Sequence, residues 1–181
     1  MDTNFPQRLD ELMDGDFNPE SAAVQSTANA VSPFNSVRRL NALLRAEISA
    51  AETYRMAMEK LDDPGNTQRF CIEALQRIQE DHRRAAQTIR GRIRQLGGEP
   101  VDSSGAWGAW ARFAMSAAKV FGAAAVLRSL KEGEESGLTE FRDGMPSVDD
   151  TSGSLLQNEL VPTLERHIRS LDQMIDGSGT A

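Results

Sequence analysis

Cysteine is almost missing from this chain of 181 residues, which contains a single one, Cys71. One thiol cannot form an internal disulfide, and it excludes a metal site built from several cysteines. Long apolar runs are missing as well, since none approaches the roughly 20 residues that a membrane-spanning helix needs. Met1 is followed by acidic and polar residues and not by the basic stretch and apolar run of a secretory signal. These absences favour a cytoplasmic protein that does not enter membranes.

Basic residues are also fewer than acidic ones. The chain has 20 Lys and Arg against 27 Asp and Glu, a net charge of −7. Such a balance argues against a protein dedicated to nucleic acid or to anionic membranes. The arginines that crowd one stretch are offset by neighbouring acids, so we interpret them as the solvated face of a helix. They are Arg83, Arg84, Arg90, Arg92 and Arg94, with Glu80 and Asp81 beside them.

The acidity is concentrated at the start of the chain. Residues 1–32 hold six acids and one base, and their continuation, "SAAVQSTANAVS", is small, polar and aperiodic. A segment of this kind cannot bury a core of its own. We therefore predict a disordered acidic tail over 1–32, which either docks onto a partner or serves as a plain leader.

From residue 33 onward the sequence has a helical period. Ser32 is placed to cap a first helix and Pro33 to occupy its first position. "DDPGN" at 62–66 ends that helix, and Gly97-Gly98 ends a second. The apolar seams, repeating every three or four residues, predict bundle helices. The first seam is Val37, Leu40, Leu44, Glu47, Ala51, Tyr54, Met58 and Leu61, and the second is Cys71, Leu75, Ile78, His82, Ala85, Ile89 and Ile93.

Two further helices are predicted after a segment rich in Gly, Ala and aromatics. We interpret residues 101–122 as a partly helical crossover, whose Trp107 and Trp110 either cover the bundle or contribute to a dimer interface. The third helix is expected over about 123–142 and the fourth over about 153–176, with a kink or a late start at Pro162. Their seams are Ala124, Leu127, Glu134, Leu138 and Phe141, then Leu156, Leu160, Leu164, His167, Leu171 and Met174.

Four helices with a long middle connection predict an all-α fold: a four-helix bundle over 33–176 with one long crossover between helices 2 and 3, followed by a flexible end at 177–181. Each seam is interrupted by one residue able to bind metal, and these are Glu47, His82, Glu134 and His167. A buried carboxylate costs several kcal/mol unless it is paired. Two carboxylates and two imidazoles can share a cation such as iron, manganese or zinc. The alternative is two buried ion pairs, Glu47–His82 and Glu134–His167, that hold no metal.

The stretch "LNALLRAEISAAETYRMA" resembles the first helix of the ferritin-like superfamily, bacterioferritin in particular, in which a ligand glutamate precedes a tyrosine by seven residues. Glu47 and Tyr54 match those positions. The resemblance implies Glu-x-x-His motifs on the second and fourth helices and a lone glutamate on the third, which His82, His167 and Glu134 match in part. Gln79 and Leu164 stand where those motifs have glutamate. With four of the six ligands of a di-iron centre, the chain is expected to hold a mononuclear or vestigial site.

A narrower resemblance covers about residues 37–175. "LGGEP", "GAWGAWARF" and "LKEGEE", in this order, are similar to an uncharacterised bacterial ferritin-like family of unknown function. That family implies the fold and a loose association with stress or metal handling, without a demonstrated reaction.

Two functions therefore stay open. In the first, the protein binds one or two transition-metal ions at the four seam residues, with Gln79 and Tyr54 behind them, and any activity is oxidative chemistry on iron or a small oxidant. In the second, the bundle holds no metal and serves as a scaffold or interaction module. A homo-oligomer, dimeric or larger, is expected in either case.

Overall fold

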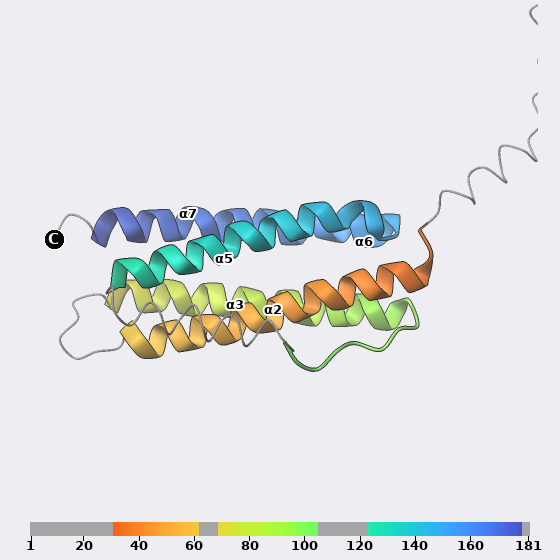
Figure 1. Cartoon of the computed structure of the whole chain (residues 1–181), viewed down its shortest axis with the longest axis horizontal. Coiled ribbons are helices and arrows are strands. Elements are labelled where there is room, and N and C mark those ends of the chain that lie inside the picture. Colours follow the sequence, from red (N-terminus) through yellow and green to blue (C-terminus); the bar gives the residue numbers. More distant parts are fainter. Residues whose placement is uncertain (1–30, 62–68, 105–122, 179–181) are drawn as a thin grey trace, which may run out of the picture. The chain divides into compact units, whose positions relative to one another are not determined.

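The structure, a computed structural model, describes residues 31–61, 69–104 and 123–178 (Figure 1). These residues all belong to one unit, Val31–Ala181. They form helices and no strand, which confirms the all-α prediction for the described part of the chain. The predictions for 1–30, for the 62–66 turn and for 105–122, with Trp107 and Trp110, fall outside the described residues. The helices are α2 (Pro33–Leu61), α3 (Arg69–Gln95), α5 (Ala123–Gly144), α6 (Asp150–Leu155) and α7 (Val161–Ser178), with the short turns η3 (Met145–Ser147) and η4 (Leu156–Leu160).

Helix α2 begins where the sequence predicted. Pro33 is its first residue, and the backbone N–H of Asn35 donates to Ser32 Oγ at 3.3 Å. The proline needs no partner for a missing N–H, and the serine satisfies one of the free N–H groups of the first turn.

Helix α3 ends at the predicted glycines. Gly97 has a φ of 75°, and its N–H donates to Arg94 O while that of Gly98 donates to Ile93 O. This pair of bonds is the Schellman motif, which needs a residue in the left-handed region and so favours glycine there. Gly98 also lies against Val37, leaving no room for a Cβ. The end of α3 is therefore packed onto the start of α2.

The fourth helix starts earlier than predicted. Asp149 caps it by accepting from Ser152 N at 3.1 Å, so α6 begins at Asp150 and not near 153. Helix α5 likewise continues to Gly144, and α7 continues to Ser178. The prediction of a late start at Pro162 is wrong.

Pro162 is accommodated by a π turn, η4, in which the N–H of Val161 donates to Leu156 O. The core positions Ser152, Leu156, Leu160 and Leu164 are spaced by four residues. On an α-helix of 3.6 residues per turn this spacing would drift by about 40° at each step. A π turn contains more residues, so it absorbs part of that drift and keeps the positions facing the core.

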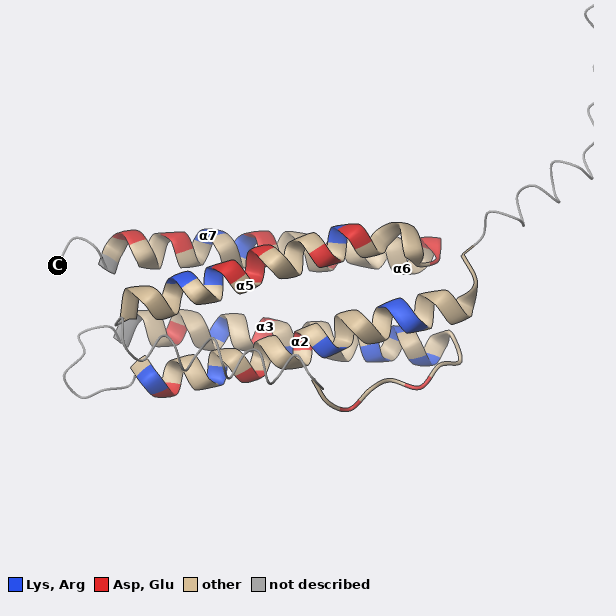
Figure 2. Ribbon diagram, in the orientation of Figure 1, with Lys and Arg blue, Asp and Glu red and all other residues tan. Residues whose placement is uncertain are grey.

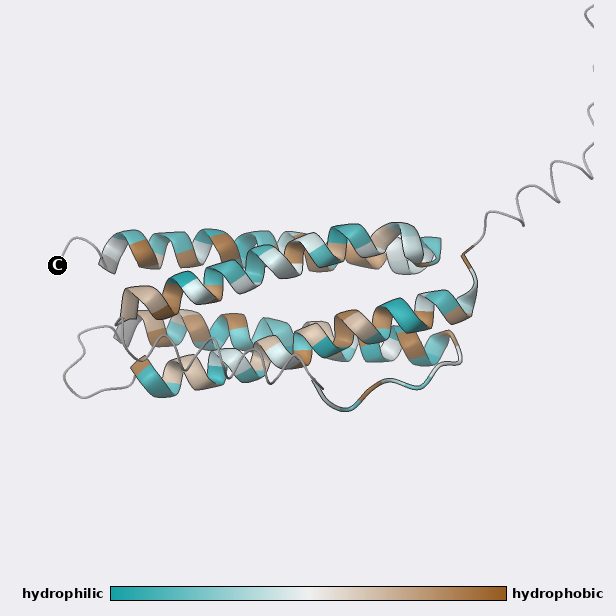
Figure 3. Cartoon of the chain, viewed as in Figure 1, coloured by the Kyte–Doolittle hydropathy of each residue, from teal (hydrophilic) through white to brown (hydrophobic). Residues whose placement is uncertain are grey.

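The four long helices pack side by side. In Figure 1, α2 and α7 run in one direction and α3 and α5 in the other. Hydrophobic and hydrophilic bands alternate along every helix (Figure 3). Charges of both signs are interspersed on them (Figure 2), and two ion pairs link α5 to the last helix, Lys131–Asp172 at 2.6 Å and Arg142–Glu165 at 2.7 Å. Among the described residues, no helix is both long and apolar enough to cross a bilayer.

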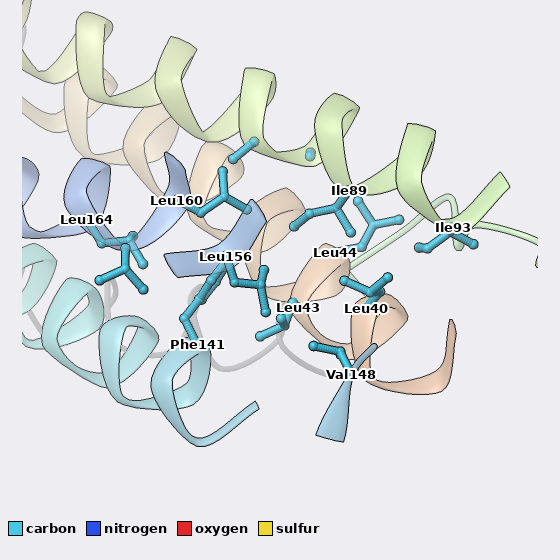
Figure 4. Close-up of a cluster of buried hydrophobic side chains, with 13 residues drawn as sticks. Leu40, Leu43, Leu44, Ile89, Ile93, Phe141, Val148, Leu156, Leu160 and Leu164 are labelled. Atoms are coloured by element: carbon cyan, nitrogen blue, oxygen red, sulfur yellow. The ribbon is translucent and has the colours of Figure 1, made fainter. Parts of the chain in front are cut away.

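The core consists of two apolar clusters. One of them gathers residues from α2, α3, α5 and the fourth helix around Leu40, Ile89 and Leu156 (Figure 4). The other includes Tyr54, Leu75 and Leu171. Every residue of the seams predicted for α3 and for the fourth helix is buried, whereas in α2 Leu43 and Ala57 are buried without having been predicted.

Candidate metal centre

Each long helix places one polar residue between the two apolar clusters. These residues are Glu47, His82, Glu134 and His167, and each is at most 3% exposed. On every helix, cluster residues lie both before and after the polar one. The four residues that the sequence singled out therefore occupy a common layer in the middle of the core.

Glu134 is the centre of this layer. Its Oε1 lies 2.8 Å from His82 Nε2, and its Oε2 lies 3.3 Å from His167 Nδ1. The two rings are close, with centroids 5.0 Å apart. The structure therefore brings Glu134 into contact with both histidines.

The outer nitrogen of each imidazole faces a different carboxylate. His82 Nδ1 lies 2.8 Å from Glu47 Oε2, and His167 Nε2 lies 3.1 Å from Asp81 Oδ2. The outer nitrogen of each ring therefore contacts a carboxylate, while the inner nitrogens of both rings converge on Glu134. Such outer contacts fix the orientation of an imidazole and which nitrogen is free to bind.

Within the described residues, a metal-compatible group is formed by His82, Glu134 and His167. One ligand atom from each lies within 4.8 Å of the others. Glu47 is not part of this group, because its carboxylate approaches the opposite nitrogen of the His82 ring. The structure thus brings all four predicted residues together, but the His82 ring stands between Glu47 and Glu134.

Tyr54 lies beside the group and donates its hydroxyl to Glu134 Oε1 at 2.7 Å. Burial, together with the charge of Glu134, raises the pKa of Tyr54 well above its usual value, so its phenol stays protonated and remains a donor. Gln79, the other residue expected behind the site, is buried and donates its Nε2 to Ala51 O at 2.9 Å. It joins α3 to α2 and is not a hydrogen-bond partner of the four site residues.

The electrostatics of the layer favour a charged pair. Burial alone would lower the pKa of His82, but the charges of Glu134 and Glu47 outweigh it and hold that pKa well above its usual value. Burial would raise the pKa of Glu134, and the charge of His82 with the hydrogen bonds from both histidines instead lowers it. At neutral pH His82 is therefore an imidazolium that donates to two carboxylates.

Asp81 is the member of the layer that sequence reasoning missed as a site residue. It bonds to His167, Arg166 and Arg84, and these partners lower the pKa of Asp81 although its partial burial would raise it. Its side chain is 19% exposed, so it lies where the layer reaches the surface. The only signal in the sequence was its place next to His82, on the flank of a buried seam.

Residues 35–146 match the family described as Domain of unknown function (DUF2383), and this region is more than half of the chain. The chain belongs to this family. No curated protein and no solved structure matches it. The predicted resemblance to a family of unknown function is confirmed to that extent, with a helical domain as its fold.

The DUF2383 match spans α2, α3 and α5, which carry Glu47, His82 and Glu134. His167 lies beyond the matched residues, on α7. The histidine that completes the metal-compatible group therefore comes from the last helix, outside the region that defines the family.

Proposed function

We propose that this protein binds one transition-metal ion, iron, manganese or zinc, through His82 Nε2, His167 Nδ1 and the Glu134 carboxylate. The observation that carries the proposal is that both imidazoles turn their inner nitrogens toward one carboxylate while Glu47 and Asp81 hold their outer nitrogens. This is how proteins orient histidines that bind metal.

The donor set fits such an ion. Two imidazoles and one carboxylate are a ligand set of catalytic zinc sites and of mononuclear iron(II) sites. A bound ion of this kind supplies Lewis-acid or redox chemistry, with coordination positions left for water or a small oxidant. The chain's own residues exclude bulk water from the layer, orient the two rings and steady Glu134 through the Tyr54 hydroxyl.

Glu47 takes a different role from the one the sequence suggested. In our proposal it is not a ligand but a positioning residue that accepts from His82 Nδ1 and keeps Nε2 turned inward. Gln79 and Leu164 stand where the two Glu-x-x-His motifs have glutamate, so both motif carboxylates are missing. This agrees with a mononuclear site, which needs fewer carboxylates than a di-iron one.

We also infer that the bundle is ferritin-like, with one long crossover. The support is the direction of the helices: α3 and α5 run the same way in Figure 1. The end of α3 and the start of α5 therefore lie at opposite ends of the bundle, as they do in the one-crossover class.

The test is metal analysis of protein purified without chelators and then loaded in turn with Fe(II) under anaerobic conditions, Mn(II) and Zn(II). We expect close to one equivalent of at least one ion, and loss of binding in the double variant His82→Ala/His167→Ala. Glu135→Gln, on the exposed side of α5, is the matched control and should bind as the wild type does. Wild-type stoichiometry in the double variant would refute the assigned site.

Glu47→Gln separates a positioning residue from a ligand. Loss of an outer partner of a ligating histidine typically weakens metal binding about 10- to 100-fold without abolishing it. Unchanged affinity in Glu47→Gln would remove the proposed role.

A second candidate function, a metal-free scaffold, is favoured by the 2.8 Å contacts on both sides of His82. These are ordinary lengths for charge-assisted hydrogen bonds, so the layer is satisfied by protons alone. If none of the three ions binds the folded protein, this candidate replaces the first.

A further inference from the structure

A groove lies on the α2–α3 pair, apart from the metal-compatible group. Its volume is about 290 Å³, just below the usual range for ligand pockets. Residues of both helices line it, and none of the four residues of the polar layer is among them. The residues that decide its chemistry are Arg55, Arg83, Arg90, Glu52, Ile48 and Ala86.

Positive charge dominates the lining, with three arginines against one glutamate. That glutamate, Glu52, accepts from Ser104 Oγ at 3.2 Å. Arg90 is partly buried and has no ion-pair or hydrogen-bond partner within the described part of the chain. Such a guanidinium retains its donors for an anion.

The other two arginines can turn to a ligand at little cost. Arg55 pairs with Glu59 and Arg83 with Glu80, but the side chains of both arginines are more than half exposed. Exposed pairs of this kind contribute little to stability. Their guanidinium groups are therefore available to a ligand that offers a better acceptor than a solvated carboxylate.

The lining also has an apolar part, formed by Ile48 and Ala51 of α2 and Ala86 of α3. Gln79 of the lining donates to Ala51 O. A free inorganic anion would leave this surface without a partner. A ligand with an apolar body would cover it and release water.

We propose that this groove binds a small organic carboxylate, with the carboxylate on Arg90 and Arg83 and an apolar chain along Ile48, Ala51 and Ala86. A guanidinium fork matches a carboxylate in two parallel hydrogen bonds, which gives the head group its specificity. The site is separate from the proposed metal centre and does not depend on it.

The test is calorimetric titration of the full chain with octanoate, octylammonium and inorganic phosphate. Octanoate should bind saturably, while octylammonium, of equal length and opposite charge, and phosphate, which lacks the apolar chain, should bind at least tenfold more weakly. Arg90→Gln and the double variant Arg83→Gln/Arg90→Gln should weaken octanoate binding by about tenfold or more. Arg94→Gln, an exposed arginine of α3 outside the lining, should leave it unchanged.

Circular dichroism of each variant checks that the helices are retained. Equal binding of octanoate and octylammonium would show a merely apolar groove and overturn the proposal. So would octanoate affinity that is insensitive to Arg83 and Arg90, or phosphate binding that exceeds that of octanoate. Metal loading of His82→Ala/His167→Ala has no bearing on these outcomes, so the two proposals stand or fall separately.

Discussion

Replacing Glu134 by glutamine tests the centre of the polar layer. The side chain keeps its shape, and its amide oxygen can still accept from Tyr54 and His82. The negative charge is lost, which leaves the His82 imidazolium with Glu47 as its one carboxylate partner. Breaking a buried ion pair by removing one partner typically costs 3–5 kcal/mol. Because Glu47 and the retained hydrogen bonds compensate in part, we expect a loss of about 3 kcal/mol in the free energy of unfolding.

The assay is urea unfolding followed by far-ultraviolet circular dichroism, with EDTA present so that metal does not contribute. Glu135→Gln is the control, since it removes a charge one position away whose pair with Lys131, at 3.5 Å, is solvent-exposed. Such a pair is worth at most about 0.5 kcal/mol on a helix surface.

The pH dependence gives a second readout. The lowered pKa of Glu134 means that its contribution is present above the usual glutamate value and is lost as the pH falls through the folded value. The difference between wild type and Glu134→Gln should therefore shrink in acid. In nitrogen-15 NMR spectra, the raised pKa of His82 should fall in the variant. A stability within 0.5 kcal/mol of wild type, or an unchanged His82 titration, would refute the idea that the charge of Glu134 holds the layer.

Three further substitutions test a helix cap and the glycines of α3 and of the turn that follows it. Burial would raise the pKa of Asp149, but bonds from Ser152 and Arg92 lower it to about 2 from 3.8. Asp149→Ala should therefore cost about 2 kcal/mol at pH 7, and this cost should shrink as the pH falls through about 2, as urea unfolding across that range can check. Gly98→Ala should destabilise by roughly 1–2 kcal/mol, because its Cβ would lie 2.5 Å from Val37 Cγ1. Gly91→Ala, which meets nothing within 4 Å, should instead stabilise α3 by about 0.5–1 kcal/mol; a matching loss in both variants would contradict the packing argument.

The periodicity of the sequence was enough to find the four residues of the layer. A polar side chain on an apolar seam of a bundle must enter the core, wherever the neighbouring helices lie. His82 and His167 were found for this reason, and both are buried. The same reasoning predicted the end of α3, because Gly97 and Gly98 allow a termination that few other residues permit.

Other features depend on geometry that a linear pattern does not contain. Which carboxylate faces which nitrogen of His82 is set by side-chain torsion angles and by the position of α5, and so the sequence could not show that Glu47 faces Nδ1 while Glu134 faces Nε2. Asp81 lies on the flank of its seam, where a residue reaches either solvent or the neighbouring helix. The start of α6 was missed because "DDTSG" contains residue types that favour both loops and helix caps.

The layer between the two apolar clusters also determines how the helices align along their length. Leucine-rich seams alone tolerate a slip of one helical turn, since one apolar side chain then replaces another of similar size. With the layer present, a slip of α5 by one turn, about 5.4 Å, would take Glu134 away from Tyr54, His82 and His167. Such a misaligned bundle would contain a carboxylate without partners in its core. The polar layer therefore favours a single register of the four helices, whether or not a metal ion is bound.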